Sequence, residues 1–434
     1  AADVEPFKDN VVKEPLISDE SVLKGSPVKK SAQNASLGTT EWTLKNGIKV
    51  VIKQPPYEAD NISVQAVSDG GAAVFGDDLY YSSQMLGSVM SASGISKFSA
   101  SDLRKQLAGK SVRASLGVSQ YKHSVSASAA LKDVETMFQL LYLQFTAPSF
   151  SEDGFNTLMK RYDAMLANQM TDPDFIFSQQ LQKTLYGDNY RRQQLTPAVL
   201  DMIKFEQIEP AYKALFSNAG NFTTYIVGNV DLETLKPLVE KYIGSLPTSK
   251  KVEYANVDDG VRFAQGGVTN DFTAKMQQPK VGLTRIYTGP IEYTLKNRVA
   301  MNVLSQVLRS RYTISIREEK GGTYSVGVGG RVMPEYEPWY QLIVLFDTNE
   351  QMADELSQIV VDEIKKIATN GPNKEDVEKT RKYLLKEYEN QIQSNYNWVD
   401  WLDEYNYRGV DFATEYKKAV EELTYDDLKA LAAK

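Results

Sequence analysis

The 434-residue sequence contains no cysteine and a single histidine, His123. The lack of cysteine excludes disulfide bonds, thiolate nucleophiles and every zinc site built from cysteine ligands. With one histidine, the chain alone cannot form a site that needs two imidazoles. A lone histidine between two predicted strands is more often a surface residue than a metal ligand or a base, so we assign His123 no catalytic role.

Two further absences limit the partners of the chain. The formal net charge is −7, and no cluster of lysine and arginine is large enough for a nucleic-acid groove, so we expect no nucleic-acid partner. No run of about 18 apolar residues occurs, so the sequence predicts no membrane-spanning helix. Apolar residues make up 42% and charged residues 24% of the chain, which is typical of a globular protein, and the length suggests two or three domains.

The patterning of hydrophobic residues divides the chain into a polar arm and two larger segments. Residues 1–38 carry no helical or strand periodicity and predict an extended arm or interdomain linker. Residues 39–250 open with a hairpin signal at Asn46-Gly47 and continue as alternating strands and amphipathic helices. Residues 251–275 are charged and loop-like and predict a second linker, which leaves residues 276–434 as the remaining domain.

The second large segment repeats the first. The sequence ASLGVS (114–119) aligns with YSVGVG (324–329), and the helical segments 150–169 and 372–391 share their length and a closing Asn-Gln. Duplication best explains such a repeat, so both copies should share one fold. We predict an α+β protein with two homologous domains, each a mostly antiparallel sheet with helices packed on one face.

The two predicted domains differ at their ends. In the first copy a helix leads into the strand NFTTYIVGNV (221–230), whereas the second copy stops at Lys434. A sheet without that strand would expose an edge. We therefore expect the last strand of the second sheet to be missing, and its place to be filled by a continuing native chain or by a borrowed strand.

A glycine-rich stretch, IREEKGGTYSVGVGG (316–330), allows two interpretations. A phosphate-binding loop would place its lysine after the glycines and just before a helix, but here Lys320 precedes them and a strand-like alternation follows. The favoured interpretation is a helix that ends at Gly321-Gly322, with Gly321 in the left-handed region, and then turns into a strand. The glycines inside that strand suggest that a ligand or another backbone passes closely; they are Gly327, Gly329 and Gly330.

From about Thr39 to its end the chain resembles the pitrilysin/insulinase superfamily of zinc metallopeptidases. Residues 39–53 are similar to the opening hairpin of the family's domains, and residues 218–247 are similar to their closing strand and helix. The most specific match is LRSRYTISIREEKGGTYSVGVG (308–329), which is similar to the arginine/tyrosine segment of the later, non-zinc domain. Arginine and tyrosine keep a seven-residue separation across a glycine turn.

The resemblance implies roles for these residues. In such enzymes two half-shells close around a peptide, and the first domain binds zinc through an H-x-x-E-H motif and a distal glutamate. By this resemblance Arg317 would bind a substrate carbonyl and Tyr324 would donate its hydroxyl to the tetrahedral oxyanion. Gly327, Gly329 and Gly330 would let the substrate or the other half approach closely. The matching positions of the first copy hold Leu107 and Ala114.

The chain departs from the family pattern at the zinc motif. The equivalent place in the helix expected at 77–90 reads QMLGS (84–88), which offers no histidine and no glutamate. We therefore expect no metal or other cofactor in this chain, and zinc in an N-terminal half. The resemblance narrows to the C-terminal, non-zinc half of a large bacterial member, with residues 1–38 as the linker between halves. The start of the sequence, AADVEPFKDN, also suggests a processed product or a piece of a longer chain.

The expected function is therefore peptide binding and transition-state stabilisation for a metal site on another half, without independent proteolysis. The expected partners are an N-terminal zinc-bearing half or subunit and a peptide substrate. The same motifs fit a separate non-catalytic partner subunit or a peptide-binding pseudo-peptidase scaffold, and the sequence leaves these alternatives open. The family suggests the periplasm as the compartment, with the cytoplasm as the alternative.

Overall fold

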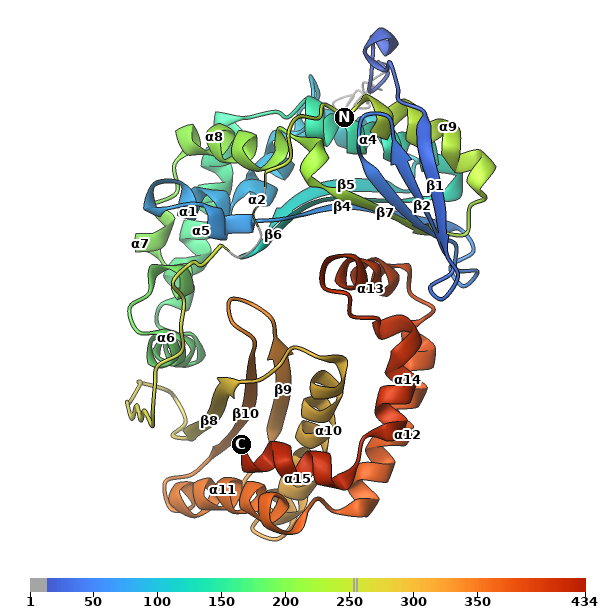
Figure 1. Ribbon diagram of the computed structural model, residues 1–434. Helices are drawn as coiled ribbons and strands as arrows, with labels where there is room; N and C mark the ends of the chain where they lie inside the picture. Colours follow the sequence, from blue (N-terminus) through green and yellow to red (C-terminus); the bar gives the residue numbers. More distant parts are fainter. Residues whose placement is uncertain (1–13, 253, 255–256) are drawn as a thin grey trace, which may run out of the picture. The chain divides into compact units, whose positions relative to one another are not determined.

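The computed structural model describes residues 14–252, 254 and 257–434 (Figure 1). Within these residues the chain forms two compact units. Unit 1 takes the described parts of Ala1–Asp172 and Gln194–Asp259, and unit 2 takes Pro173–Gln193 and Gly260–Lys434. Residues 173–193 lie inside the domain expected at 39–250, yet they pack with unit 2.

Unit 1 is built on a seven-stranded sheet in the order β1-β2-β3-β7-β4-β6-β5. All neighbouring strands are antiparallel except β3 and β7, which are parallel. The strands are β1 (Val28–Asn34), β2 (Thr39–Leu44), β3 (Lys49–Lys53), β4 (Asn61–Asp69), β5 (Val112–Val118), β6 (Lys122–Ala130) and β7 (Thr223–Gly228). The β2–β3 hairpin turns at Asn46-Gly47 as predicted, with Gly47 at φ +92°.

Strand β1 lies within the segment 1–38 that the sequence suggested as an arm. Its residues, VKKSAQN, are almost all exposed, so they lack the hydrophobic alternation by which a strand is recognised. It pairs with β2 along the outer edge of the sheet, where lysines are common because they discourage further pairing. Residues 1–13 of the expected arm lie outside the described residues.

Helices cover one face of the unit 1 sheet, toward which every second residue of β4 and β6 is buried (Figure 1). The single helix expected at 77–90 is two helices, α1 (Asp77–Ser83) and α2 (Leu86–Ser93), which meet at Gln84-Met85. The others are α3 (Ala100–Gln106), α4 (Val134–Thr146), α5 (Glu152–Gln169), α7 (Pro197–Leu200), α8 (Phe205–Phe216) and α9 (Leu232–Tyr242).

Unit 2 has a three-stranded antiparallel sheet in the order β8-β10-β9. Its strands are β8 (Val281–Pro290), β9 (Gly327–Met333) and β10 (Trp339–Thr348). Its helices are α6 (Pro173–Tyr186), α10 (Leu295–Tyr312), α11 (Ala353–Asn370), α12 (Lys374–Gln391), α13 (Asn395–Arg408), α14 (Phe412–Glu422) and α15 (Tyr425–Ala433). None of the helices described in either unit is long and apolar enough to cross a membrane.

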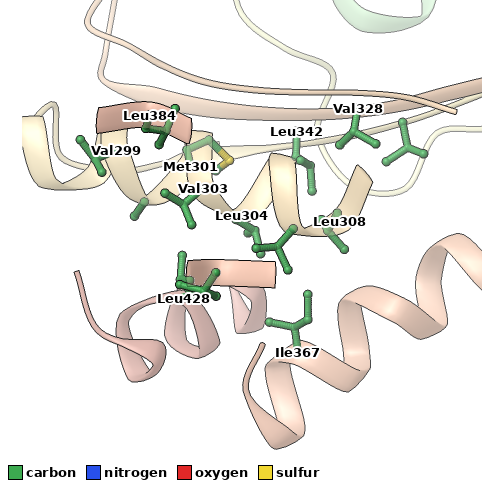
Figure 2. Packing of buried hydrophobic residues seen from close by; sticks show 14 of the residues in the cluster. Val299, Met301, Val303, Leu304, Leu308, Val328, Leu342, Ile367, Leu384 and Leu428 are labelled. Carbon is green, nitrogen blue, oxygen red and sulfur yellow. The ribbon is translucent and has the colours of Figure 1, made fainter. Parts of the chain in front are cut away.

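Helix α10 is the centre of the unit 2 core. Figure 2 shows its apolar side chains between the sheet, represented by Val328 and Leu342, and side chains of three other helices. Those partners are Ile367 of α11, Leu384 of α12 and Leu428 of α15. Val303, Leu308 and Leu428 are fully buried, so α10 is held on several sides.

The two units confirm the predicted α+β class and share a strand order. In unit 1 the strands run β4-β6-β5, and in unit 2 they run β8-β10-β9, so in each case the third strand in sequence lies between the other two. A helical segment follows the first strand in both copies. Among the described residues, no strand takes the place beside β8 that β7 takes beside β4.

The described residues of 251–275, expected as a linker, form neither helix nor strand but pack onto both units in turn. On unit 1, the hydroxyl of Tyr121 donates a 2.9 Å hydrogen bond to Asp259. On unit 2, the ring of Phe263 packs against Trp339 at 4.8 Å and against Tyr186 of α6 at 5.0 Å. Aromatic side chains therefore anchor a stretch whose overall composition is polar.

His123 is buried, with 1% of its surface exposed, so the expectation of a surface residue is wrong. It occupies an inward-facing position of β6, and its Nδ1 accepts a 3.1 Å hydrogen bond from the backbone N–H of Gly71. The rings of Phe216, Phe222 and Tyr254 surround it. Burial lowers the pKa of His123 to about 4, although an interaction with the backbone of Leu215 acts in the opposite direction. The imidazole is therefore neutral at pH 7.

Candidate functional site

The candidate site begins where α10 widens at its C-terminal end. Residues Thr313–Glu318 form a π-helical turn, η7, in which the N–H of Glu319 bonds to the carbonyl of Ile314 at 2.9 Å. Within this turn Ile316 is fully buried and belongs to the core around α10. A π-type turn advances the chain less per residue than an α-helix and is frequent at functional sites. In this protein the π-helical turn places Arg317 directly after Ile316, whose side chain is fixed in the core.

The turn closes at the two glycines, which confirms the predicted helix end. Gly321 has φ +60°, and its N–H bonds to the carbonyl of Arg317 at 3.0 Å. The N–H of Gly322 bonds to the carbonyl of Ile316 at 3.0 Å. This pair of bonds resembles the usual glycine C-cap, but it is wider because the preceding turn is π-helical.

Arg317 and Tyr324 come together on the two sides of this turn. The guanidinium carbon of Arg317 lies 5.5 Å from the centre of the Tyr324 ring, within the range of a cation–π contact. The side chain of Tyr324 is 87% exposed. The arrangement presents a permanent positive charge and a neutral phenol donor at one place. Such a pair can bind a carbonyl oxygen or a developing oxyanion.

The three glycines expected in substrate binding lie in β9 and face opposite sides of the sheet. Gly330 faces α10, where a Cβ atom would lie 2.8 Å from the carbonyl oxygen of Met301. Gly327 and Gly329 face the other side, where a Cβ atom would lie 3.2 Å from the side chains of Leu345 and Ile343, respectively. Packing inside unit 2 therefore requires glycine at position 330, whereas a role of the three glycines in substrate binding stays a prediction.

Replacing Gly330 with alanine should destabilise unit 2 by about 1–3 kcal/mol, because the new methyl group would press on the backbone of α10. The matched control is Gly329→Ala in the same strand, whose methyl group meets a side-chain methyl group, Cγ2 of Ile343, and no backbone atom within 4 Å. Alanine at that strand position should be neutral or slightly stabilising. Urea unfolding of both variants measures the difference, and equal losses would contradict the packing assignment.

The structure holds no candidate zinc site in the place where the family carries one. Residues 84–88 span the junction of α1 and α2, and none of them has a carboxylate or an imidazole. Across residues 14–252, 254 and 257–434, no group of three or more histidine, aspartate or glutamate side chains could hold a metal ion. The counterparts of the arginine/tyrosine pair in unit 1, Leu107 and Ala114, carry no polar side chain. The residues that the structure describes therefore do not fit zinc.

Sequence reasoning missed the residues of β10 and α11 that contact the glycine turn. The hydroxyl of Thr348, at the end of β10, donates a 2.6 Å hydrogen bond to the carbonyl of Gly322. A Cβ atom on Gly322 would overlap the side chain of Leu356 in α11. These contacts join residues about 26 to 34 positions apart, so no local pattern could have shown them.

A comparison with known families matches part of this chain. Residues 203–384 match the family described as the Peptidase M16 inactive domain. That match covers less than half of the chain: it spans the end of unit 1 and continues through unit 2 to Leu384, so it includes Arg317, Tyr324 and the glycine turn.

Similar proteins span several organisms. The chain is 25% identical over 366 residues to a protein of Escherichia coli named "Probable zinc protease PqqL" and 22% identical over 412 residues to the "Zinc protease PQQL-like" of Arabidopsis thaliana. It covers 38% and 40% of these relatives, respectively, so it spans about two fifths of their length.

Two solved structures show the same fold. The periplasmic protease PqqL of Escherichia coli matches with a TM-score of 0.83 and 21% identity, over 100% of this chain and 47% of that one. A peptidase M16 inactive domain from Pseudomonas fluorescens matches with a TM-score of 0.72 and 16% identity, over 92% of this chain and 95% of that one. In these comparisons the chain is therefore similar to zinc proteases of the M16 type and, over residues 203–384, to the M16 inactive domain.

Proposed function

We propose that this chain is the non-zinc half of a zinc-dependent endopeptidase, which binds peptide and stabilises the transition state for a metal site on an N-terminal half. One observation carries the proposal: across the glycine turn the guanidinium carbon of Arg317 lies 5.5 Å from the centre of the Tyr324 ring, on a chain whose described residues do not fit zinc. Two donors without a metal can assist hydrolysis but cannot start it.

The roles of the two side chains follow from their chemistry. The guanidinium of Arg317 is always charged and presents several N–H donors, which suits a substrate carbonyl oxygen. The hydroxyl of Tyr324 donates a hydrogen bond without ionising, which suits the oxyanion of a tetrahedral intermediate. The exposed position of Tyr324 leaves that hydroxyl accessible to a peptide.

Strand β9 would guide the peptide toward this pair. Among the described residues it pairs with β10 alone, so an extended peptide could add to its other edge. Gly327 and Gly329 have no side chains to obstruct it. The carbonyl of Val328 in β9 already has a hydrogen-bond donor, because the guanidinium of Arg309 donates a 2.6 Å hydrogen bond to it. A docked peptide would share or displace that bond.

A second candidate is a separate partner subunit or a pseudo-peptidase scaffold, expressed apart from any zinc-bearing half. The observation that favours this second candidate is that two similar solved chains have about the same length as this chain and contain no further half. The Pseudomonas fluorescens inactive domain and a protease from Helicobacter pylori are matched over 95% and 96% of their own lengths. For either candidate we place the protein in the periplasm, because a similar solved structure is described as a periplasmic protease.

The purified chain should not cleave peptides by itself, because its described residues offer no site for the catalytic metal. A quenched fluorescent peptide measures cleavage by the chain alone and by the chain mixed with, or fused to, a zinc-bearing M16 half. We expect turnover only with that half and none after chelation. Chelator-sensitive cleavage by the chain alone would contradict the proposal. Peptide binding without any gain in turnover would favour the pseudo-peptidase scaffold.

A further inference from the structure

The turn between Arg317 and Tyr324 is anchored at both ends by the core. Ile316 is fully buried on the helical side, and Val326 is 8% exposed on the strand side. Between these anchors the chain reverses through Gly321 and Gly322. The distance between the two functional side chains therefore depends on what fixes the peptide groups of the glycines.

Three contacts from outside the turn reach it. The hydroxyl of Thr348 donates a buried 2.6 Å hydrogen bond to the carbonyl of Gly322. The missing side chain of Gly322 lets α11 approach so closely that any Cβ atom would overlap Leu356. The third contact is an ion pair between Lys320 and Glu355, which is half-exposed on both sides and contributes little in water.

Of these three contacts, only the one from Thr348 is both buried and directional. Thr348 is 9% exposed and ends the central strand of the unit 2 sheet, where it is paired with Val281 of β8, so its own position is fixed by the sheet. A hydrogen bond from a rigid strand to the carbonyl of a glycine sets the orientation of that peptide plane. Because glycine backbones are the most permissive, the residue itself does little to fix that plane, and the hydrogen bond from Thr348 restricts it directly.

We infer that Thr348 is a positioning residue whose hydroxyl, through the Gly322 carbonyl, sets the separation of Arg317 and Tyr324. The inference rests on the proposed function of that pair. Thr348 itself touches no substrate. Its effect is to keep two donors at a fixed spacing, and a small error in such spacing is costly in catalysis.

Three variants test this inference. Thr348→Val removes the hydroxyl and keeps the shape of the side chain, and Thr348→Ser keeps the hydroxyl. Thr380→Val is the matched control, because the hydroxyl of Thr380 is equally buried and donates a 2.8 Å hydrogen bond to the carbonyl of Asp376, within α12. Valine at either threonine should change the thermal stability by similar amounts.

Two measurements separate positioning from stability. The first is the ¹⁹F resonance of 3-fluorotyrosine placed at position 324 in the full chain, and the second is kcat and KM of the chain assembled with a zinc-bearing half. We expect Thr348→Val to move the resonance and to lower kcat by roughly 10- to 100-fold with little change in KM. Thr348→Ser should restore both values, and Thr380→Val should leave both unchanged.

The outcomes distinguish this inference from the proposed function. An unchanged resonance in Thr348→Val, or an equal change in Thr380→Val, overturns the positioning role. A resonance that moves while kcat stays the same supports the positioning role, and it counts against the proposed function of Arg317 and Tyr324.

Discussion

Replacing Tyr324 with phenylalanine should lower kcat of the assembled peptidase by roughly 10²- to 10³-fold, or about 3–4 kcal/mol of transition-state stabilisation. The change removes only the hydroxyl that would donate to the oxyanion. Because 87% of the side chain is exposed, the fold should be unaffected. KM should change little, since the ring and Arg317 remain. Steady-state kinetics with a fluorogenic peptide measure both constants.

A matched control for this experiment is Tyr383→Phe, another exposed tyrosine of unit 2, on α12. We expect it to leave kcat and KM at the wild-type values. Equal activity of Tyr324→Phe and the wild-type enzyme would remove the tyrosine from the mechanism. If peptide binding persisted in that case, unit 2 would act as a recognition surface.

The stability of unit 1 should fall by about 3 kcal/mol as the pH decreases from about 6.5 to about 4, because of His123 alone. In the unfolded chain this imidazole takes up a proton near pH 6.5. In the folded chain burial lowers its pKa to about 4, so the proton binds the unfolded state first and favours it. Well above pH 6.5 the imidazole is neutral in both the folded and the unfolded chain, so His123 causes no loss of stability there. Urea unfolding at a series of pH values measures it.

A His123→Asn variant provides the control for this pH dependence. Its amide oxygen can still accept the hydrogen bond from Gly71, but it does not titrate. His123 is the single histidine of the sequence, so between pH 6.5 and 5 no other imidazole contributes. The variant should be less stable at pH 7 and should lack the decrease in that window. The same decrease in both proteins would show that other groups cause it.

The regular elements of the fold were predictable where the sequence carries a strong local pattern. The β2–β3 hairpin has an Asn-Gly turn, and the helices α4 and α5 have long amphipathic repeats. The break between α1 and α2 was not predictable from periodicity. It arises where Gly87 lets α2 approach the backbone of Leu116 in β5, and tertiary packing of this kind overrides a continuous helical pattern.

The residues of the candidate site were predictable from the sequence, but the contacts that hold the glycine turn in place were not. Arg317, Gly321 and Tyr324 lie within one short stretch, so the glycine turn could be recognised from the sequence. Thr348 and Leu356 reach that turn from β10 and α11, and their contacts depend on the whole fold of unit 2. Burial of His123 was missed for the same reason, since its aromatic neighbours Phe216, Phe222 and Tyr254 lie far away in the sequence.

The placement of residues 173–193 has a consequence for how the gene could be divided. The polypeptide passes between the units at 172–173, at 193–194 and at 259–260, so no single cut separates them. After a cut at 259–260, α6 would remain covalently part of the first fragment. Phe177 and Tyr186 would still hold the second fragment through Phe272 and Phe263. A gene fragment that begins at residue 276 would leave Trp339 without its ring partner Phe263. A split or permuted version of this protein must therefore carry α6 with the second unit.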